Sequence, residues 1–284
     1  MNGTLYIVGT PIGNLEDMTF RAIRILNEVD LITAEDTRIT KKLLSHFNIH
    51  TEIISYHRHS NAKRENEIID ILLAGKNVAL VTDAGMPAIS DPGYELVARA
   101  ILDDIKVVPI PGVSSVVTAL SISGVNSDQF LFLGFLPRNK KEIVKTVSQT
   151  IKSFPSICSV AFEAPHRISK TVEILNEIAP NLQIVIAREL TKKFEELIRG
   201  SAAELANQNL DLKGEIVIIW SMPHNNEQHK NEIANIAEEN FENALNFARQ
   251  EMERGESLKS AAKNAKEKFN ISKKEVYDRL LKKD

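Results

Sequence analysis

The chain has 284 residues, of which 43% are hydrophobic and 26% are charged, and its formal net charge is −3. This composition is ordinary for a globular protein and excludes collagen-like, low-complexity and largely disordered chains. Cys158 is the only cysteine, so a disulfide framework and a four-cysteine zinc site are excluded. The start of the sequence shows no leader pattern, and no stretch approaches the ~18 apolar residues of a membrane span. We therefore expect a soluble, cytoplasmic protein of about two domains.

The first 120 residues alternate short runs rich in Val and Ile with helical patterns. Such a strand–helix repeat predicts a mainly parallel sheet with helices on both faces. The expected strands are 5–9, 30–34, 52–56, 77–82 and 106–110, and helical spacing marks 20–27, 39–47, 68–73 and 96–101. We expect this first α/β domain to span residues 1–123.

A second α/β domain is expected over residues 124–222. Three of its strands fall close together with one short helix, about 202–209, between them, which favours a mixed and partly antiparallel sheet. The expected strands are 130–135, 157–162, 183–188, 194–199 and 215–220.

Residues 223–284 are expected to form a helical tail. Apolar residues from Ile233 to Met252 follow helical spacing, including Ile236 and Ala237, and Gly255 ends the pattern. Ser257 and Ser272 predict the starts of two further helices, the second with a Ser272–Glu275 capping box. The pair resembles a helix-turn-helix. Residues 257–284 carry nine basic and four acidic residues, so a solvated helical face and an RNA-binding module both stay open.

Glycine turns follow three strands of the first block, at 9–14, 82–93 and 111–115. Because the carboxyl ends of parallel strands meet at one sheet edge, these loops predict a cleft. The first turn is neither G-x-G-x-x-G nor a Walker loop, and Pro11 removes an amide donor that a pyrophosphate would need. Glu35 and Asp36 come at the end of the second expected strand, where a nicotinamide site has its ribose-binding acid. A nicotinamide-binding site is therefore a minor alternative.

Polar segments of the second block, at 134–138, 163–167 and 187–192, also follow expected strands. They can converge on a cleft between the two domains, although surface salt bridges would explain them as well. His57 and His59 share one strand face but have no nearby carboxylate or cysteine in sequence, so we expect no metal site. No G-x-S-x-G elbow for a serine hydrolase occurs.

Eight motifs in order resemble those of one family. They are TPIGN at 10–14, AEDTR at 34–38, DAGMPAISDPG at 83–93, PGVSS at 111–115, GFLPR at 134–138, EAPHR at 163–167, ARELTK at 187–192 and FEE at 194–196. Together they are similar to the RsmI family, ribosomal small-subunit RNA methyltransferases that modify a decoding-centre cytidine of 16S rRNA on its 2′-oxygen. Met86 departs from the expected DAGTP pattern, which puts a hydroxyl contact there in doubt.

The resemblance implies a two-domain tetrapyrrole-methylase fold, of the class III methyltransferases, with S-adenosylmethionine between the domains and a homodimer. It also implies a small helix-turn-helix-like C-terminal tail. Carried over by motif, the cofactor-binding residues are Pro11, Ile12, Gly13, Asp83, Gly85, Met86, Pro87, Ser114, Ser115, Phe135, Ala164, Pro165, Ala187 and Gly214.

Methyl transfer to a ribose hydroxyl chiefly requires alignment of the oxygen with the methyl group, and a nearby carboxylate or histidine can accept the proton. Among several candidates, which include Glu35, His57, Glu163, His166 and Glu195, we expect Asp36 and Glu189 to lie near the hydroxyl. The cations expected to hold RNA phosphates are Arg38, Arg138, Arg167 and Lys192.

Two other functions stay open. The first is a methyltransferase of the same fold that acts on a tetrapyrrole carbon, which would have no evident use for residues 223–284. The second is a noncatalytic RNA-binding module built on a methylase fold.

Overall fold

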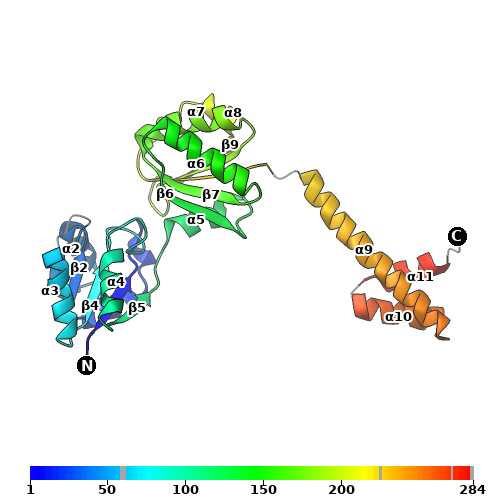
Figure 1. The fold of residues 1–284 in the computed structure, drawn as a ribbon, viewed down its shortest axis with the longest axis horizontal. Helices are drawn as coiled ribbons and strands as arrows, with labels where there is room; N and C mark the ends of the chain where they lie inside the picture. Colours follow the sequence, from blue (N-terminus) through cyan, green and yellow to red (C-terminus); the bar gives the residue numbers. More distant parts are fainter. Residues whose placement is uncertain (58–61, 224–225, 270, 282–284) are drawn as a thin grey trace. The chain divides into compact units, whose positions relative to one another are not determined.

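The structure is a computed structural model that describes residues 1–57, 62–223, 226–269 and 271–281 (Figure 1). It divides into two compact units, Met1–Pro223 and His224–Asp284. The first unit contains two five-stranded sheets and the second contains helices. The three-domain division of the chain stays a prediction, because both sheets belong to one compact unit.

The first sheet is parallel throughout, with strand order β3-β2-β4-β1-β5. Its buried central strands are short and rich in Val, Ile and Leu, as expected for strands covered on both faces. The strands are β1 (Thr4–Val8), β2 (Leu31–Ala34), β3 (Ile53–Ser55), β4 (Val78–Val81) and β5 (Lys106–Ile110). This order places the carboxyl ends of β1 and β4 side by side.

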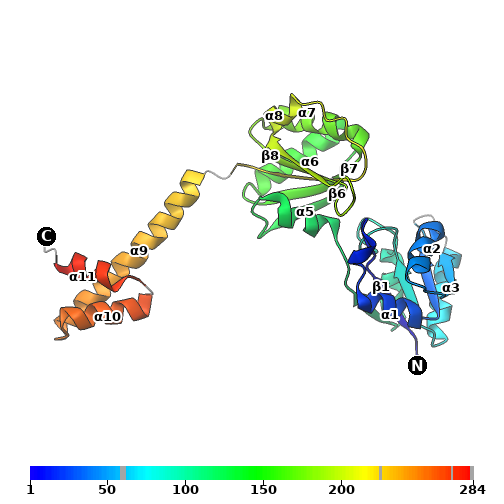
Figure 2. The same ribbon diagram turned by 180° about the vertical axis from the view of Figure 1, so that it is seen from behind.

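Alternate residues of these strands enter two separate cores. Val8, Ile32 and Ala79 pack against α1 (Phe20–Glu28) and α2 (Thr37–His46) on one face. Leu5, Leu31 and Leu80 pack against α3 (Ala62–Leu73) and α4 (Tyr94–Leu102) on the other. Figures 1 and 2 show these helix pairs from opposite sides. A short 3-10 helix, η1 (Leu15–Asp17), leads from β1 to α1.

The second sheet is mixed, with strand order β6-β7-β10-β8-β9. Only the β6–β7 pair is parallel, and the remaining pairs are antiparallel. The strands are β6 (Phe130–Phe135), β7 (Cys158–Glu163), β8 (Gln183–Arg188), β9 (Glu196–Ser201) and β10 (Ile216–Ser221). The register of β6 on β7 shifts between Phe132 and Phe135, so the end of β6 bulges.

Helices cover both faces of the second sheet. One core contains Trp220 and residues of α6 (Lys140–Ser153), α7 (Ile168–Ile178) and α8 (Ala202–Ala206), and η2 (Pro165–Arg167) precedes α7. The other core contains α5 (Ser115–Ser123), which follows β5 of the first sheet. Ile12, from the turn after β1, is buried in that same core and so joins the first turn to the second sheet.

The second unit consists of α9 (Asn226–Glu253), α10 (Leu258–Phe269) and α11 (Lys273–Leu281). Its core is made of small side chains, mainly alanines, with Leu245 and Val276 fully buried. Ser257 and Ser272 accept hydrogen bonds from the amides of Ser260 and Glu275, as their sequence positions predict. The predicted apolar positions Ile233, Ile236 and Ala237 lie where the structure does not describe side chains.

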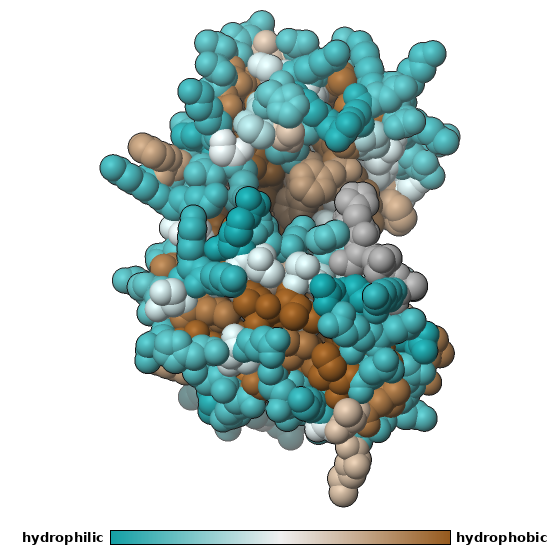
Figure 3. Space-filling model, turned by 90° about the vertical axis from the view of Figure 1, so that its left-hand side faces the viewer, coloured by the Kyte–Doolittle hydropathy of each residue, from teal (hydrophilic) through white to brown (hydrophobic). Residues whose placement is uncertain are grey.

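The predicted fold class is confirmed: one parallel sheet, one mixed sheet and a helical C-terminal part. Over the described residues, no helix is long and apolar enough to cross a membrane. On the face in Figure 3, hydrophobic residues (brown) lie in patches among hydrophilic ones (teal).

Candidate functional site

The turns after β1, β4 and β5 interlock at the carboxyl end of the first sheet. Thr10 and Gly85 exchange backbone hydrogen bonds, with N–O distances of 2.9 and 3.1 Å, and the Thr10 hydroxyl donates to the Thr82 carbonyl at 3.1 Å. A Cβ at Gly9 would lie 2.7 Å from Gly112 Cα and 2.6 Å from Met86 Sδ. Glycine is therefore required there, and the three predicted loops pack closely against one another.

Asp36 is the N-cap of α2. Its carboxylate accepts a hydrogen bond from the Arg38 amide at 2.8 Å and pairs with the Arg38 guanidinium at 2.5 Å. These contacts lower the pKa of Asp36 to about 2. A carboxylate with so low a pKa is a weak proton acceptor.

Asp83, two residues after β4, has the opposite character. Its Oδ1 accepts a hydrogen bond from the Asp36 amide at 3.0 Å. Burial raises the pKa of Asp83, the Asp36 amide partly opposes this, and the negative charges of Glu35 and Asp36 add to the increase. Beside it, the Thr82 hydroxyl donates to Glu35 at 2.7 Å. Asp83 is thus the better proton acceptor of the two aspartates.

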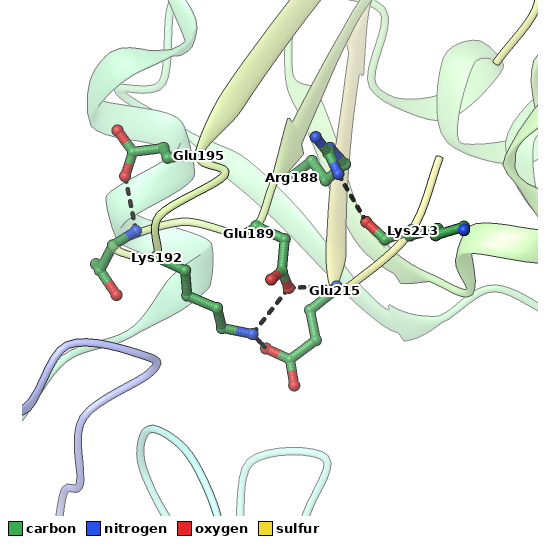
Figure 4. Close-up of polar contacts among 7 residues, drawn as sticks. Arg188, Glu189, Lys192, Glu195, Lys213 and Glu215 are labelled. Atoms are coloured by element: carbon green, nitrogen blue, oxygen red, sulfur yellow. Dashed lines mark hydrogen bonds and ion pairs between the residues drawn. The ribbon is translucent and has the colours of Figure 1, made fainter. Parts of the chain in front are cut away.

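An ion network, drawn in Figure 4, joins the loop between β8 and β9 to Glu215, which directly precedes β10. The Lys192 ammonium lies 2.9 Å from Glu189 and 2.8 Å from Glu215, and Glu189 also accepts the Glu215 amide at 2.9 Å. The Lys192 hydrogen bond and then the Glu215 amide lower the pKa of Glu189. Burial lowers the pKa of Lys192, but its two carboxylate partners outweigh that effect and raise it.

The backbone of this loop is strained. Glu189 and Thr191 have φ values of 50° and 67°, in the left-handed region that side chains disfavour. The Glu195 carboxylate accepts the Thr191 amide at 2.6 Å and closes the loop. A Cβ on Gly13 would overlap the Lys192 stem, so the bare glycine of the first turn allows this loop to approach.

A cavity of about 310 Å³ lies at this junction. Its lining combines turns and helices beside the first sheet with loops beside the second, and it brings together the predicted residues Pro11, Ile12, Gly13, Asp83 and Lys192. Residues that the sequence analysis did not select complete it: Thr10, Leu15, Ile39, Thr40, Lys42, Leu43, Thr82, Ala84 and Glu215. The spacing of Ile39, Lys42 and Leu43 on one helical face was the signal that could have indicated them.

The remaining predicted cofactor residues do not line this cavity. Gly85 and Met86 belong to the interlocked turns, and Ser114 caps α5 without a side-chain hydrogen bond. Phe135 is exposed and packs on Phe162, with ring centroids 5.2 Å apart. Gly214, with φ 92°, makes room for the Glu189 carboxyl group. The others are Pro87 and Ser115 in the first block and Ala164, Pro165 and Ala187 in the second.

Arg167 has internal partners. Its guanidinium donates to the carbonyls of Leu136, at 3.1 Å, and Pro137, and it pairs with the buried Glu163 carboxylate at 3.2 Å. Thr171 donates to the same carboxylate at 2.6 Å. These contacts tie the end of β6 to η2 and α7, whereas Arg138 and Arg38 are exposed.

Among the described residues, no group of three or more His, Cys, Asp or Glu side chains could hold a metal ion. His57 is described, and His59 lies outside the described residues.

The matching family profile gives the class of protein to which the chain belongs. The family profile of Tetrapyrrole (Corrin/Porphyrin) Methylases matches residues 4–206. Solved structures with this fold include a diphthine synthase (TM-score 0.62, 15% identity, 77% of this chain and 90% of that chain) and cobalt precorrin-4 methyltransferase (TM-score 0.57, 16% identity, 77% and 94%). At this identity they show the fold alone.

Closer relatives are both named ribosomal RNA small subunit methyltransferase I. The Bacillus subtilis protein is 43% identical over 97% of this chain and 93% of its own, and the Halalkalibacterium halodurans protein is 50% identical over 76% and 75%. The chain therefore belongs to the ribosomal RNA small subunit methyltransferase I family of the tetrapyrrole methylases, and the predicted family is confirmed.

As a member of this family, the chain is a methyltransferase with S-adenosylmethionine as its cofactor. The residues of the cavity fit that molecule. Pro11 lacks an amide donor, which a cofactor without phosphate groups does not need. Glu215 supplies negative charge for a sulfonium cation, and Ile12 supplies apolar wall.

Proposed function

We propose that the chain methylates the 2′-oxygen of a cytidine in the decoding centre of 16S rRNA. The observation that carries the proposal is the similarity to the Bacillus subtilis enzyme, which extends over 97% of this chain and so includes the C-terminal helices. A tetrapyrrole enzyme would have no evident use for those helices. We further propose that the protein is cytoplasmic, acts on the small ribosomal subunit and works as a homodimer.

Methyl transfer requires the protein chiefly to align the two reactants and to remove a proton. When bound, S-adenosylmethionine supplies an electrophilic methyl group whose sulfonium charge disappears on transfer. Asp83 lines the cavity and has a raised pKa, so we propose that it accepts the proton of the ribose 2′-hydroxyl. Asp36 donates its backbone N–H to the Asp83 carboxylate and thereby orients it.

We also propose Asp36 and Glu189 as site residues, and their role is to orient other charged groups. Asp36 holds Arg38 and Glu189 holds Lys192, and both carboxylates have lowered pKa values. We propose that Arg38, Lys192 and the exposed Arg138 contact RNA phosphates. Arg167 is better explained as a positioning residue for the β6 end, because its donors already meet two carbonyls and Glu163.

The test incubates the purified protein with tritium-labelled S-adenosylmethionine and small ribosomal subunits from cells that lack this activity. Nuclease digestion and mass spectrometry then map the label, which is expected on a cytidine 2′-oxygen. Label on a base, or label only on an added tetrapyrrole, would overturn the proposal. Cofactor binding without label on subunits, free RNA or tetrapyrroles would favour the noncatalytic module.

Two variants test the assigned roles. Asp83→Asn should retain cofactor binding and lose methyl transfer by about 100-fold or more, the usual scale of a lost proton acceptor. Asp36→Ala keeps the backbone N–H that holds Asp83 but removes the carboxylate partner of Arg38, so it should retain cofactor binding while losing methyl transfer. An unchanged turnover number would remove the substituted aspartate from the site.

A further inference from the structure

One wall of the cavity is not used by any of the roles assigned above. Ile39, Lys42 and Leu43 of α2 line it, and Leu15 of η1 adds to it. Residues at i, i+3 and i+4 lie on one face of a helix, so α2 presents these three side chains together. We call Leu15, Ile39, Lys42 and Leu43 the α2 wall.

The α2 wall exposes apolar surface on a firm support. Ile39 is 44% exposed and Leu15 is 39% exposed, which leaves two large apolar side chains uncovered at the cavity. Leu43 packs in part against the core between α1, α2 and the first sheet. Asp36 caps the start of the same helix. The wall therefore belongs to a capped helix packed on the core, and it leaves apolar side chains that a flat apolar group can cover.

The two lysines of the cavity differ in their partners. Lys192 is held by Glu189 and Glu215, at 2.9 and 2.8 Å. Lys42 is exposed, and within the described part of the chain its ammonium makes neither a hydrogen bond nor an ion pair. A cation without a counter-charge beside apolar surface fits a ligand that carries both a flat ring and a phosphate.

Methyl transfer requires both reactants in one cavity, because the attacking oxygen must approach the methyl carbon to about 3 Å. One side of the cavity is lined by the turn residues Pro11, Ile12 and Gly13 and by the loop that contains Asp83. We assign this side to the cofactor. The α2 wall remains for the acceptor.

We propose that the α2 wall is the subsite for the target nucleotide of a single-stranded RNA segment. The base packs on Leu15, Ile39 and Leu43, and Lys42 contacts a flanking phosphate. This inference rests on the proposed function for the identity of the acceptor, but its binding test does not require turnover.

The first test measures binding of a short single-stranded RNA to the full chain by fluorescence anisotropy at increasing salt. Lys42→Ala should reduce the magnitude of the slope of log affinity against log salt by about 0.7, the value for one phosphate contact on a single strand. Lys41→Ala is the matched control, since Lys41 is the neighbouring exposed lysine of α2 and does not line the cavity. It should keep the wild-type slope.

The second test separates acceptor from cofactor. Lys42→Ala and Ile39→Asn should raise KM for small ribosomal subunits by about tenfold, the loss expected for a charged hydrogen bond or a lost packing surface, while Kd for S-adenosylmethionine stays unchanged. Leu73→Asn is the control for Ile39→Asn, because Leu73 is equally exposed at 45% on α3 and lies off the cavity.

The outcomes distinguish this inference from the proposed function. A wild-type protein that binds RNA through Lys42 but leaves subunits unlabelled would overturn the proposed function and support the subsite. Active wild-type protein with equal RNA slopes for Lys41→Ala and Lys42→Ala would overturn the subsite alone. An equal rise in Kd for S-adenosylmethionine in the Lys42 and Ile39 variants would assign the wall to the cofactor and also overturn it.

Discussion

At the scale of single residues, Asp36 links the local structure of α2 to the site. Its side chain caps the helix and pairs with Arg38, and its amide hydrogen-bonds Asp83. Glu35 and Asp36, which follow β2, therefore differ in their contacts from the ribose-binding acid of a nicotinamide site. One carboxylate is tied to its own helix and the other, Glu35, accepts the Thr82 hydroxyl.

The low pKa of Asp36 predicts how the free energy of unfolding changes at acid pH. Because its folded pKa of about 2 lies below the ordinary 3.8, the ionised side chain contributes stability that is complete above pH 3.8 and is lost as the pH falls toward 2. Asp36→Asn keeps a capping oxygen but removes the charge. Its free energy of unfolding should therefore fall less steeply with pH in this interval. Urea unfolding across the interval measures the slope, and parallel curves for both proteins would contradict the prediction.

Gly214 is required for a steric reason. Its φ is 92°, and a Cβ there would overlap the Glu189 carboxyl group. Gly214→Ala should lose about 1–3 kcal/mol of unfolding free energy and release Lys192 from Glu189. Gly124→Ala is the control, since Gly124 has φ 77° with nothing within 4 Å of a Cβ. Denaturant titration of both variants should show the larger loss for Gly214→Ala, and equal losses would argue against the clash.

At the scale of elements, the buried Glu163–Arg167 pair fixes the end of β6 against α7. Glu163 is 3% exposed, and it is satisfied by Thr171, Arg167 and the Ala164 amide. Phe135 and Arg138 flank the two carbonyls that Arg167 holds, so this network ties down the backbone between both exposed residues.

Removing one partner of a buried ion pair leaves the other charge without compensation. Arg167→Ala should therefore cost about 3–5 kcal/mol of unfolding free energy. Lys140→Ala breaks the exposed Lys140–Glu177 pair, whose side chains are 50% and 57% exposed, and should cost less than about 1 kcal/mol. Equilibrium unfolding compares them, and similar losses would show that Arg167 stabilises the chain no more than a surface lysine does.

At the scale of the whole molecule, the chain consists of two compact units with separate cores. Leu245 is 1% exposed in the core of the second unit and Leu5 is fully buried in the first. Each Leu→Ala substitution should cost about 2–5 kcal/mol within its own unit.

Calorimetry tests the independence of the units. Leu245→Ala should lower only the transition of the helical unit, and Leu5→Ala only that of the larger unit. A single transition that shifts with either substitution would show that the two units unfold together.

Most helices and strands could be predicted from local sequence patterns. The strand at 106–110 was predicted to the residue because a run rich in Val and Ile precedes a Pro-Gly turn there, and Gly255 ends a helix as expected. The prediction for β9 began two residues early, at 194, because Phe194 is apolar. In the structure Phe194 is 63% exposed in the turn that Glu195 closes, a placement set by contacts with Thr191.

The sequence by itself determined the fold class, the family and the loops that meet at the first sheet, because these depend on periodicity and on motifs read along the chain. The tertiary structure decided which partners the charged groups have. It tied Arg167 to carbonyls and Glu163, and Lys192 to two glutamates, and it separated the pKa values of Asp36 and Asp83. Such pairings join residues distant in sequence, and burial and hydrogen bonding, which set a pKa, exist only once the chain has folded.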